Sequence, residues 1–484
     1  MEKKRYKLIG SKEFYRRVFG IIVPVIIQNM VTSFVSLLDN IMVGRVGTEE
    51  MSGVAIGNQL MFVFNLGVFG ALSGIGIFTA QYFGAEDEEG VKQTIRAKFL
   101  VILAFAALCA LVFGFGGEPL VTLFLNDTDN PEGVVKTLDA GLTYLHIMCW
   151  GLLPFGISQV FATTLKESGE TRLPMAASVC AVAVNLCFNY ILIFGHFGAP
   201  KLGVAGAAIA TLISRFVEVF IMAFAVYGRR LRQGGQAAKG LSADRRADME
   251  SRSRFSFFDG VFKSFYIDPV LAKNMLVRGL PLFINELLWA LAMSGIAQCY
   301  SMRGLDAVAA VNITNTIFNL LSQAVFSMGT AISIIVGQYL GAGEFEKAKE
   351  TDYQLLALAV MAGVVVGIVS ALLCPLFPQL YNTTEDVRAL ARTLLLIDSL
   401  YCPLLAYVHA AYFTVRSGGK TMVTFFFDSF YMMVLVYPVA FALSRFTGLS
   451  LPWIYLCVRA VDLVKATVGT ILVLKGVWIH RIIQ

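Results

Sequence analysis

Residues 98–117 read KFLVILAFAALCALVFGFGG, an uninterrupted apolar run whose single charged side chain stands at its start. A helix of about 20 apolar residues can cross the hydrocarbon core of a bilayer, whereas a barrel strand needs about 10 residues and alternates in polarity. The whole chain of 484 residues has the same character: 57% is hydrophobic and 15% is charged, against about 45 to 50% and about 25% in soluble domains. The sequence therefore predicts an all-α protein that spans a membrane.

Runs of this kind recur along the chain, so we predict twelve transmembrane helices. Their approximate bounds are 18–43, 54–80, 98–117, 137–163, 174–197, 204–227, 276–300, 308–337, 353–377, 391–414, 421–445 and 452–475. The long connection at 228–275 carries nine Lys or Arg between Arg229 and Lys263, which is typical of a cytoplasmic linker. Its second part, 255–271, mixes phenylalanines with charged residues and predicts a short amphipathic helix on the membrane surface.

The positive charges lie mainly on one side of the predicted spans. Of the 39 Lys and Arg, 29 fall in the N-terminus, the even-numbered loops and the C-terminus. Seven fall in the odd-numbered loops and three within spans, when residues at span edges are counted with the adjoining loop. Because cytoplasmic loops are rich in Lys and Arg, we predict a multi-pass inner (plasma) membrane protein with both termini in the cytoplasm. The net charge of +6 then reflects topology and not a nucleic-acid partner.

The two halves of the sequence resemble each other, as duplicated units do. The pairs aligned at a shift of 257 residues include Pro24 with Pro281, Gln81 with Gln338 and Gly84 with Gly341. Near a shift of 250 residues, LKESGET at 165–171 matches VRSGGKT at 415–421, and later R-x-x-E at 215–218 matches R-x-x-D at 459–462. We therefore predict two homologous six-helix lobes, 18–227 and 276–475, with an N-terminus at 1–17, a linker at 228–275 and a C-terminus at 476–484. Duplicated transporters place their substrate near the midplane between the halves.

Several motifs resemble those of bacterial exporters of the multidrug and toxic compound extrusion (MATE) family. They are Asp39 with MVGRVG at 42–47, QYFGA at 81–85, N-x-x-x-NYILIFG at 185–195, G-x-x-GAA-x-AT at 203–211 and RSGGKT at 416–421. They occur in the family's order through nearly the whole chain outside 228–275. The resemblance implies a secondary antiporter that exports amphipathic, often cationic small molecules in exchange for H+ or Na+, by rocker-switch alternating access of two lobes.

The resemblance also implies a cation-coupling site in the first lobe. The family's carboxylate, amide, hydroxyl and tyrosine match Asp39, Asn185, Thr211 and Tyr144. A second carboxylate of some relatives is here Asn189, which removes a charge and leaves the coupling ion open between H+ and a Na+ held at Asp39.

A second candidate site follows from the resemblance in the other lobe. Glu286, with Asn285 before it, matches an acid that other relatives carry on helix 7. The Asp that accompanies this acid on helix 10 is replaced by Leu405, with Tyr401 and His409 one turn to either side. We expect substrate or ion binding by Asn285, Glu286, Tyr401 and His409.

The energetics of burial independently favours a functional role for Asp39 and Glu286. An ionisable residue inside a span costs roughly 2.5 to 3.5 kcal/mol, so a function or a partner is expected. Asp39 has no basic residue within one turn, and burial favours the neutral form of a carboxyl group, as proton exchange requires. Glu286 lies near Trp289, and the charge and the ring together would attract an organic cation. Either carboxyl group could instead only hydrogen-bond a neighbouring helix.

The two repeat-related pairs of opposite charge in the spans are predicted to be structural, whereas the roles of Asp398 and Asp428 stay open. Arg215 with Glu218, and Arg459 with Asp462, stand at i and i+3 on one helix face, where opposite charges neutralise each other. Lys465 is expected to extend toward the cytoplasmic interface. Asp428 lies two turns into its span, shallow enough to contact water.

Two other classes of function remain as alternatives. A flippase for a lipid-linked saccharide precursor usually has extra spans and a more cationic cavity, and an enzyme would need a catalytic motif that this sequence lacks. The eight cysteines lie in apolar runs without paired spacing, so we expect neither disulfides nor a metal site. We expect no cofactor, drug-like small molecules as substrates, lipid around the helices, and a monomer.

The predicted topology can be tested with single cysteines introduced at positions 127 and 240 of a cysteine-free background. A membrane-impermeant maleimide should label position 127 in intact cells and label position 240 only after lysis. Labelling of both positions from outside would show that the number of spans is wrong.

Overall fold

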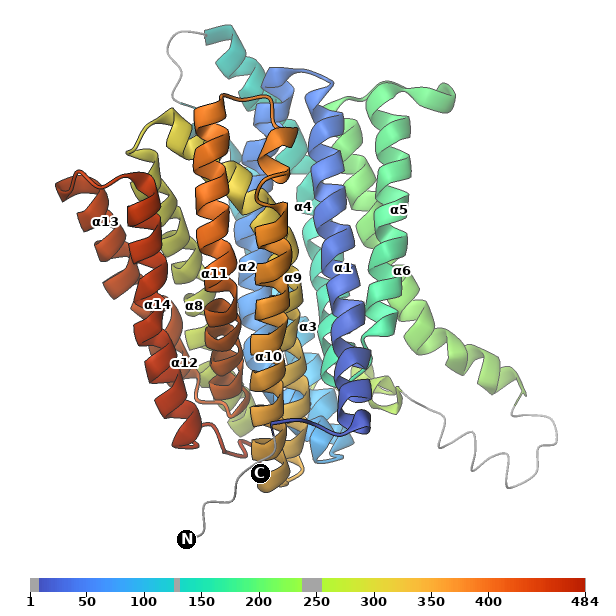
Figure 1. Cartoon of the computed structure of the whole chain (residues 1–484). Coiled ribbons are helices and arrows are strands. Elements are labelled where there is room, and N and C mark those ends of the chain that lie inside the picture. The colour runs from blue at the N-terminus through green and yellow to red at the C-terminus, as the bar shows by residue number, and fades with distance from the viewer. Residues whose placement is uncertain (1–7, 126–130, 237–254, 484) are drawn as a thin grey trace. The chain divides into compact units, whose positions relative to one another are not determined.

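A computed structural model of the protein describes residues 8–125, 131–236 and 255–483. In these ranges the regular structure is helical, with no strand. The first half supplies α1 Lys12–Gly44, α2 Thr48–Gly84, α3 Glu88–Thr122, α4 Pro131–Glu167, α5 Arg172–Phe194 and α6 Val204–Gln236 (Figure 1). The second half supplies α8 Pro269–Ser301, α9 Leu305–Gly341, α10 Phe345–Leu373, α11 Glu385–Ser417 and α14 Leu451–Leu474. A one-turn helix, η1 His196–Gly198, follows α5, and another, η4 Phe377–Leu380, precedes α11.

The eleventh predicted span is irregular. It consists of α12 Thr421–Phe425, two π-helical turns, η5 Phe426–Phe430 and η6 Met432–Val436, and α13 Tyr437–Phe446. π-Helical turns are rare and often occur at functional sites. Asp428 lies in the first of them.

The helices agree with the predicted all-α polytopic membrane protein. Among the described residues, eleven helical segments are long and apolar enough to cross a membrane. The twelfth predicted span forms as α14, but it carries Arg459, Asp462 and Lys465. Because of these three charges, α14 is not one of the eleven apolar segments. The contacts of their side chains are described below.

Contacts divide the chain into two compact units. Unit 1 comprises Met1–Ile26, Ala80–Glu86 and Lys273–Gln484, and unit 2 comprises Ile27–Thr79 and Asp87–Ala272. The first half of α1 and the last turn of α2 therefore belong to unit 1, together with the second half of the sequence.

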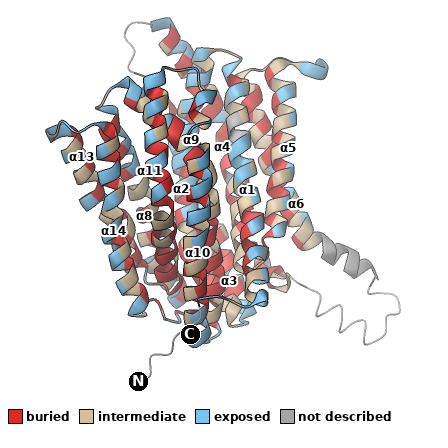
Figure 2. Cartoon of the chain, viewed as in Figure 1, coloured by how far each residue is buried: buried red, intermediate tan, exposed pale blue. Residues whose placement is uncertain are grey.

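Two pairs of repeat-related helices are buried to the same depth. In the most apolar stretch of α2 and of α9, 61% of residues are buried, and in α4 and α11 the share is 56%, whereas α3 and α10 differ, with 17% and 39%. Figure 2 marks the buried residues along the chain. The pairs α2 with α9 and α4 with α11 are those that the sequence motifs align. The duplication therefore extends from sequence to packing, with these four helices forming the interior of the units.

Small residues let the interior helices approach closely. Lipid is as apolar as the helices, so association in a membrane depends on tight contact rather than on the hydrophobic effect. In unit 2, a Cβ atom on Gly53 of α2 would lie 2.6 Å from the carbonyl oxygen of Thr137 on α4. In unit 1, a Cβ atom on Gly367 of α10 would lie 2.5 Å from the carbonyl oxygen of Ser399 on α11.

The last turn of α2 and the last turn of α9 cross within unit 1 at two repeat-related glycines. A Cβ atom on Gly84 would overlap the carbonyl group of Gln338, and a Cβ atom on Gly341 would overlap the carbonyl group of Gln81. The two backbones are thus in direct contact, and neither glycine tolerates a larger side chain without a shift of the crossing.

The glutamines at this crossing bind segments from the beginning and the end of the chain. The Arg17 guanidinium donates a hydrogen bond of 2.8 Å to Oε1 of Gln338. The backbone N–H of Ile482 donates a hydrogen bond of 2.8 Å to Oε1 of Gln81, whose Nε2 donates to the carbonyl oxygen of His480 at 3.3 Å. Trp478 is buried beside them, so the segment after α14 is packed into unit 1.

The amphipathic helix predicted over 255–271 is not formed, and this prediction was wrong. The segment contains two short 3-10 turns, η2 Ser256–Phe258 and η3 Val261–Lys263, and α8 already begins at Pro269. Phe257, Phe258 and Val261 are buried, and Arg96 of α3 donates a hydrogen bond of 2.8 Å to the carbonyl oxygen of Val261. Phe257 and Phe258 therefore pack into unit 2, whereas Phe262 and Phe265 of the same segment are exposed. The preceding part of the linker, 237–254, lies outside the described residues.

The glycine crossing predicts a stability difference between two glycine-to-alanine variants. Gly341→Ala should destabilise the protein by about 1 to 3 kcal/mol, because overpacking displaces backbone. Gly114→Ala on α3, where an added Cβ meets nothing within 4 Å, is the matched control and should be neutral. Thermal unfolding in detergent measures both, and equal midpoints would contradict the tight crossing.

Candidate functional site

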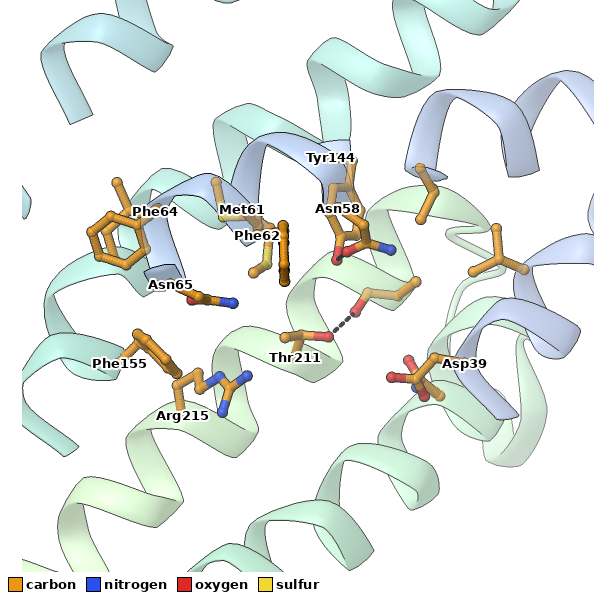
Figure 3. Close-up of a pocket in the computed structure, with 17 residues that line it drawn as sticks. Asp39, Asn58, Met61, Phe62, Phe64, Asn65, Tyr144, Phe155, Thr211 and Arg215 are labelled. Carbon is orange, nitrogen blue, oxygen red and sulfur yellow. Dashed lines mark hydrogen bonds between the residues drawn. The ribbon is translucent and has the colours of Figure 1, made fainter. Parts of the chain in front are cut away.

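Unit 2 contains a cavity of about 300 Å³ among α1, α2, α4, α5 and α6. Its lining combines a few polar side chains with aromatic and methionine surface, the usual composition of small-molecule sites. The polar lining residues are Asp39, Asn58, Asn65, Tyr144, Asn189, Thr211 and Arg215 (Figure 3). The apolar ones are Val43, Val54, Met61, Phe62, Phe64, Met148, Gly151, Leu152, Phe155 and Ala207.

Asp39 is held by amide groups of α5. Nδ2 of Asn189 donates a hydrogen bond of 2.6 Å to Oδ1 of Asp39. With its amide turned so that the nitrogen faces Asp39, Asn185 donates to Oδ1 of Asp39 at 3.0 Å and its oxygen lies 3.2 Å from the Thr211 hydroxyl; in the opposite orientation its oxygen accepts from Nδ2 of Asn189 at 3.2 Å. Oδ1 of Asn189 is buried and has no hydrogen-bond partner among the described residues. The structure thus brings together Asp39, Asn185, Asn189 and Thr211.

Tyr144 lines the same cavity without contacting this group directly. Its hydroxyl donates a hydrogen bond of 2.9 Å to Oδ1 of Asn58, a residue of α2 that the sequence did not single out. In the described residues no group of three or more His, Cys, Asp or Glu could hold a metal ion. A bound Na+ would therefore depend on Asp39 and neutral oxygens.

Arg215 of α6 also faces the cavity, which the sequence analysis missed. Its Nη1 lies 3.5 Å from Oε2 of Glu218, so the predicted i,i+3 pair is present. The guanidinium stacks over the Phe155 ring at 4.7 Å. Glu218 itself is buried and accepts a hydrogen bond of 2.6 Å from Ser178 of α5. An arginine inside a span is energetically costly and could have indicated a functional position. From the sequence, Arg215 was explained by its pairing with Glu218 alone.

In unit 1, Asn285 is at the centre of a polar group around the π-helical turn η5. Its Nδ2 donates hydrogen bonds to Oδ2 of Asp428 at 3.0 Å and to the Tyr412 hydroxyl at 3.3 Å. Asp428 forms an ion pair with Lys465 of α14 at 2.7 Å. Two predictions were therefore wrong. Lys465 is buried in contact with Asp428 and does not extend to the interface, and Asp428 forms an ion pair instead of contacting water.

Glu286 and His409 lie close to this group. Glu286 of α8 is half-buried and lies within the electrostatic influence of Arg416 and Asp428. The His409 ring packs between the rings of Phe326 and Phe413, at 5.0 Å and 4.8 Å. Nε2 of His409 has no hydrogen-bond partner among the described residues. Aromatic packing is therefore the main contact of this histidine.

Tyr401 belongs to a different cluster, with Arg459 of α14. Arg459 pairs with Asp398 of α11 at 2.9 Å, and Asp462 accepts a hydrogen bond from Tyr401. The predicted Arg459–Asp462 pair was therefore wrong, because a carboxylate on the neighbouring helix is nearer. Tyr455 completes the cluster: it receives a hydrogen bond of 2.8 Å from Arg459 and donates one of 2.7 Å to Asp398.

Lys98, the charged residue at the start of the run quoted first, is a further buried ion pair that the sequence analysis did not find. It is fully buried in unit 2, pairs with Glu167 of α4 and donates a hydrogen bond of 3.2 Å to Thr164. Its partner is 69 residues away in sequence, so no local spacing indicates the pair.

The Asp398–Arg459 pair predicts a strongly destabilising substitution. Asp398 is fully buried, and Asp398→Asn would leave the arginine without its counter-charge, at a cost of about 3 to 5 kcal/mol. Asp386→Asn at the exposed start of the same helix should cost at most about 1 kcal/mol. Thermal unfolding in detergent compares the two, and equal midpoints would show that the pair contributes no stability.

Comparison with known proteins agrees with this architecture. The MatE family model matches residues 24–191 and 281–442. The chain is 25% identical over 471 residues to the probable multidrug resistance protein NorM of Thermotoga maritima, covering 97% of this chain and 94% of that protein. It is 25% identical over 461 residues to the probable multidrug resistance protein YoeA of Bacillus subtilis, covering 93% and 92%. A solved structure described as the outward-facing conformation of a multidrug resistance MATE family transporter shares the fold, with a TM-score of 0.81 at 19% identity over 97% of each chain. The chain therefore belongs to the MatE family and is a membrane transporter, not an enzyme.

Proposed function

We propose that this protein is a secondary antiporter that exports amphipathic small molecules in exchange for a cation. The observation that carries the proposal is the placement of one amide-bound carboxylate, Asp39, on the wall of a cavity with aromatic and methionine lining. A carboxylate that changes its charge beside a substrate cavity can couple two bound species. The relatives named as multidrug resistance proteins support the substrate class, and no comparison supports the flippase alternative.

Protons are the coupling ion that the contacts of Asp39 favour over Na+. Nδ2 of Asn189 faces the carboxylate, so the oxygen of this amide points elsewhere. A Na+ ion needs oxygen ligands, and the Asn189 amide would have to turn to supply one. Protonation of Asp39 removes its negative charge and requires only that one hydrogen-bond donor moves away from the carboxyl group. This change in contacts can shift α1 between two packing states.

The other half of the chain supplies a second candidate for ligand binding. Asn285 and Glu286 of α8 lie near Tyr412, Asp428 and Lys465. The half-buried Glu286 is the carboxylate there for which no ion pair is found among the described residues. We propose that it attracts the cationic part of a substrate, that both termini lie in the cytoplasm, and that the transporter acts as a lipid-embedded monomer by rocker-switch alternating access.

An Asp39→Asn variant tests the coupling role. In proteoliposomes under an imposed proton gradient, the wild-type protein should accumulate ethidium, whereas Asp39→Asn should still bind the dye but transport it at least about tenfold more slowly. The reason is that an amide cannot alternate between charged and neutral forms. Repeating the assay with a Na+ gradient identifies the coupling ion.

The matched control is Asp139→Asn, which makes the same chemical change at an exposed position of α4. It should transport at the wild-type rate. Accumulation by Asp39→Asn at the wild-type rate, with equal reconstitution, would refute the assignment and move coupling to Glu286.

A further inference from the structure

The duplication relates Arg215 of unit 2 to Arg459 of unit 1. At the shift of 244 residues that aligns the R-x-x-E and R-x-x-D motifs, the buried Ala207, Ala210 and Ser214 of α6 match the buried Leu451, Ile454 and Val458 of α14. The two arginines therefore occupy the same position on equivalent helices, and their surroundings can be compared directly.

Arg459 is enclosed by groups that its own half of the chain supplies. Asp398 provides a carboxylate at 2.9 Å and Tyr455 accepts a hydrogen bond of 2.8 Å. The rings of Tyr401, Tyr455 and Phe318 lie 4.8 Å, 4.9 Å and 5.6 Å from the guanidinium carbon. A carboxylate held among aromatic rings is thus the ligand of this arginine.

Among the described residues, those around Arg215 that correspond to the groups enclosing Arg459 are of other types. Along α4 and α11 the buried residues coincide at a shift of 250, from Gly141 with Ala391 to Leu165 with Val415. At this shift Asp398 corresponds to Met148 and Tyr401 to Gly151. At the shifts of 244 and 257, Tyr455 corresponds to Thr211 and Phe318 to Met61. All four replacements line the cavity.

Arg215 consequently faces the cavity on the side where Arg459 meets Asp398 of the neighbouring helix, and its own carboxylate neighbour, Glu218, lies on the same helix as the arginine. Its side chain is 30% exposed, and its Nη1 lies 3.5 Å from Oε2 of Glu218, where among the described residues an ion pair but no hydrogen bond is found. Among the described residues no hydrogen bond uses its guanidinium donors. An arginine presents these donors in a planar fork that fits a carboxylate in bidentate fashion.

We infer that the cavity of unit 2 binds an aromatic carboxylate, with the carboxylate on Arg215 and the ring against Phe155 and the neighbouring methionines. The ligand takes the place that Asp398 and Tyr401 fill in the other half of the chain. This inference rests on the proposed function, because the bound molecule is the exported one. It alters the expected substrate class, since the cavity carries one positive and one negative lining residue rather than negative charge alone.

Asp39 does not occupy this guanidinium. Figure 3 shows Asp39 and Arg215 on either side of Thr211, with Arg215 beside Phe155 and Asn65. No ion pair joins the two charges among the described residues, and Asp39 is already bound by Asn189. The cavity therefore separates a position for the coupling cation from a position for an anionic group of the substrate.

Binding of two matched probes to the purified full-length protein tests this site. Equilibrium dialysis compares 1-naphthaleneacetate with 1-naphthaleneacetamide, which share the ring and differ in charge. The wild-type protein should bind the acetate more tightly. Arg215→Gln should weaken acetate binding roughly 10- to 100-fold, as expected for loss of a charge-assisted hydrogen bond, and should leave acetamide binding within about twofold. Lys136→Gln, at an exposed position of α4, removes the same charge outside the cavity and should bind both probes as the wild-type protein does.

A second variant places the carboxylate of the other half in the cavity. Met148→Asp supplies the counterpart of Asp398 and should occupy Arg215 internally, so that acetate binding is lost while acetamide binding remains. This variant decides the case if Arg215→Gln loses both probes through misfolding.

The inference is overturned if the wild-type protein binds neither probe or prefers the amide. It is also overturned if acetate binding survives in Arg215→Gln, or if Met148→Asp binds acetate as the wild-type protein does or loses both probes. The assay uses no ion gradient. Failure of cation-driven export would therefore leave its result unaffected, and failure here would leave the antiport proposal intact.

Discussion

The absence of water from the lipid core is the constraint on which this structure depends. A charged side chain within a span has to be neutralised by the protein or by a ligand, since the bilayer offers no partner. Asp398 with Arg459, Asp428 with Lys465 and Lys98 with Glu167 are neutralised internally. Asp39 and Arg215 also face a cavity, and Arg215 in addition lies 3.5 Å from Glu218. The first group of charges is therefore enclosed by protein alone, whereas Asp39 and Arg215 are open to a ligand.

Duplication supplied the same helical framework twice, and divergence gave its two copies different roles. The matching burial of α2 with α9 and of α4 with α11 shows that the framework was retained. Around the repeat-related arginines the side chains are aspartate, tyrosine and phenylalanine in one half and methionine, glycine and threonine in the other. A compact internal cluster in one half thus corresponds to a cavity in the other. Internal comparison of a duplicated transporter can therefore indicate the chemistry of a ligand that neither half contains.

The sequence predicted the features that depend on local composition, and it missed those that depend on pairing between helices. Apolar runs indicated the spans, and constant shifts indicated the repeat. We predicted that Arg459 pairs with Asp462, three residues along the same helix, but its partner is Asp398 on a neighbouring helix. The aromatic residues of 255–271 looked amphipathic because periodicity cannot distinguish a lipid surface from a protein surface. That Asp39, Asn185, Asn189 and Thr211 belong to one group was predicted through resemblance to the MATE family, whereas Asn58 has no such signal.

The composition of unit 1 has a consequence for biogenesis. This unit combines the first 26 residues and Ala80–Glu86 with the chain from Lys273 onward, and the Gln81–Ile482 hydrogen bond joins residues 401 positions apart. During synthesis the beginning of α1 and the end of α2 therefore lack their final contacts until the second half of the chain has been inserted into the membrane. Contacts of such long sequence separation form late and leave incomplete surfaces exposed in the meantime. The first half of the chain, produced alone, would lack the contacts that complete its own first two helices.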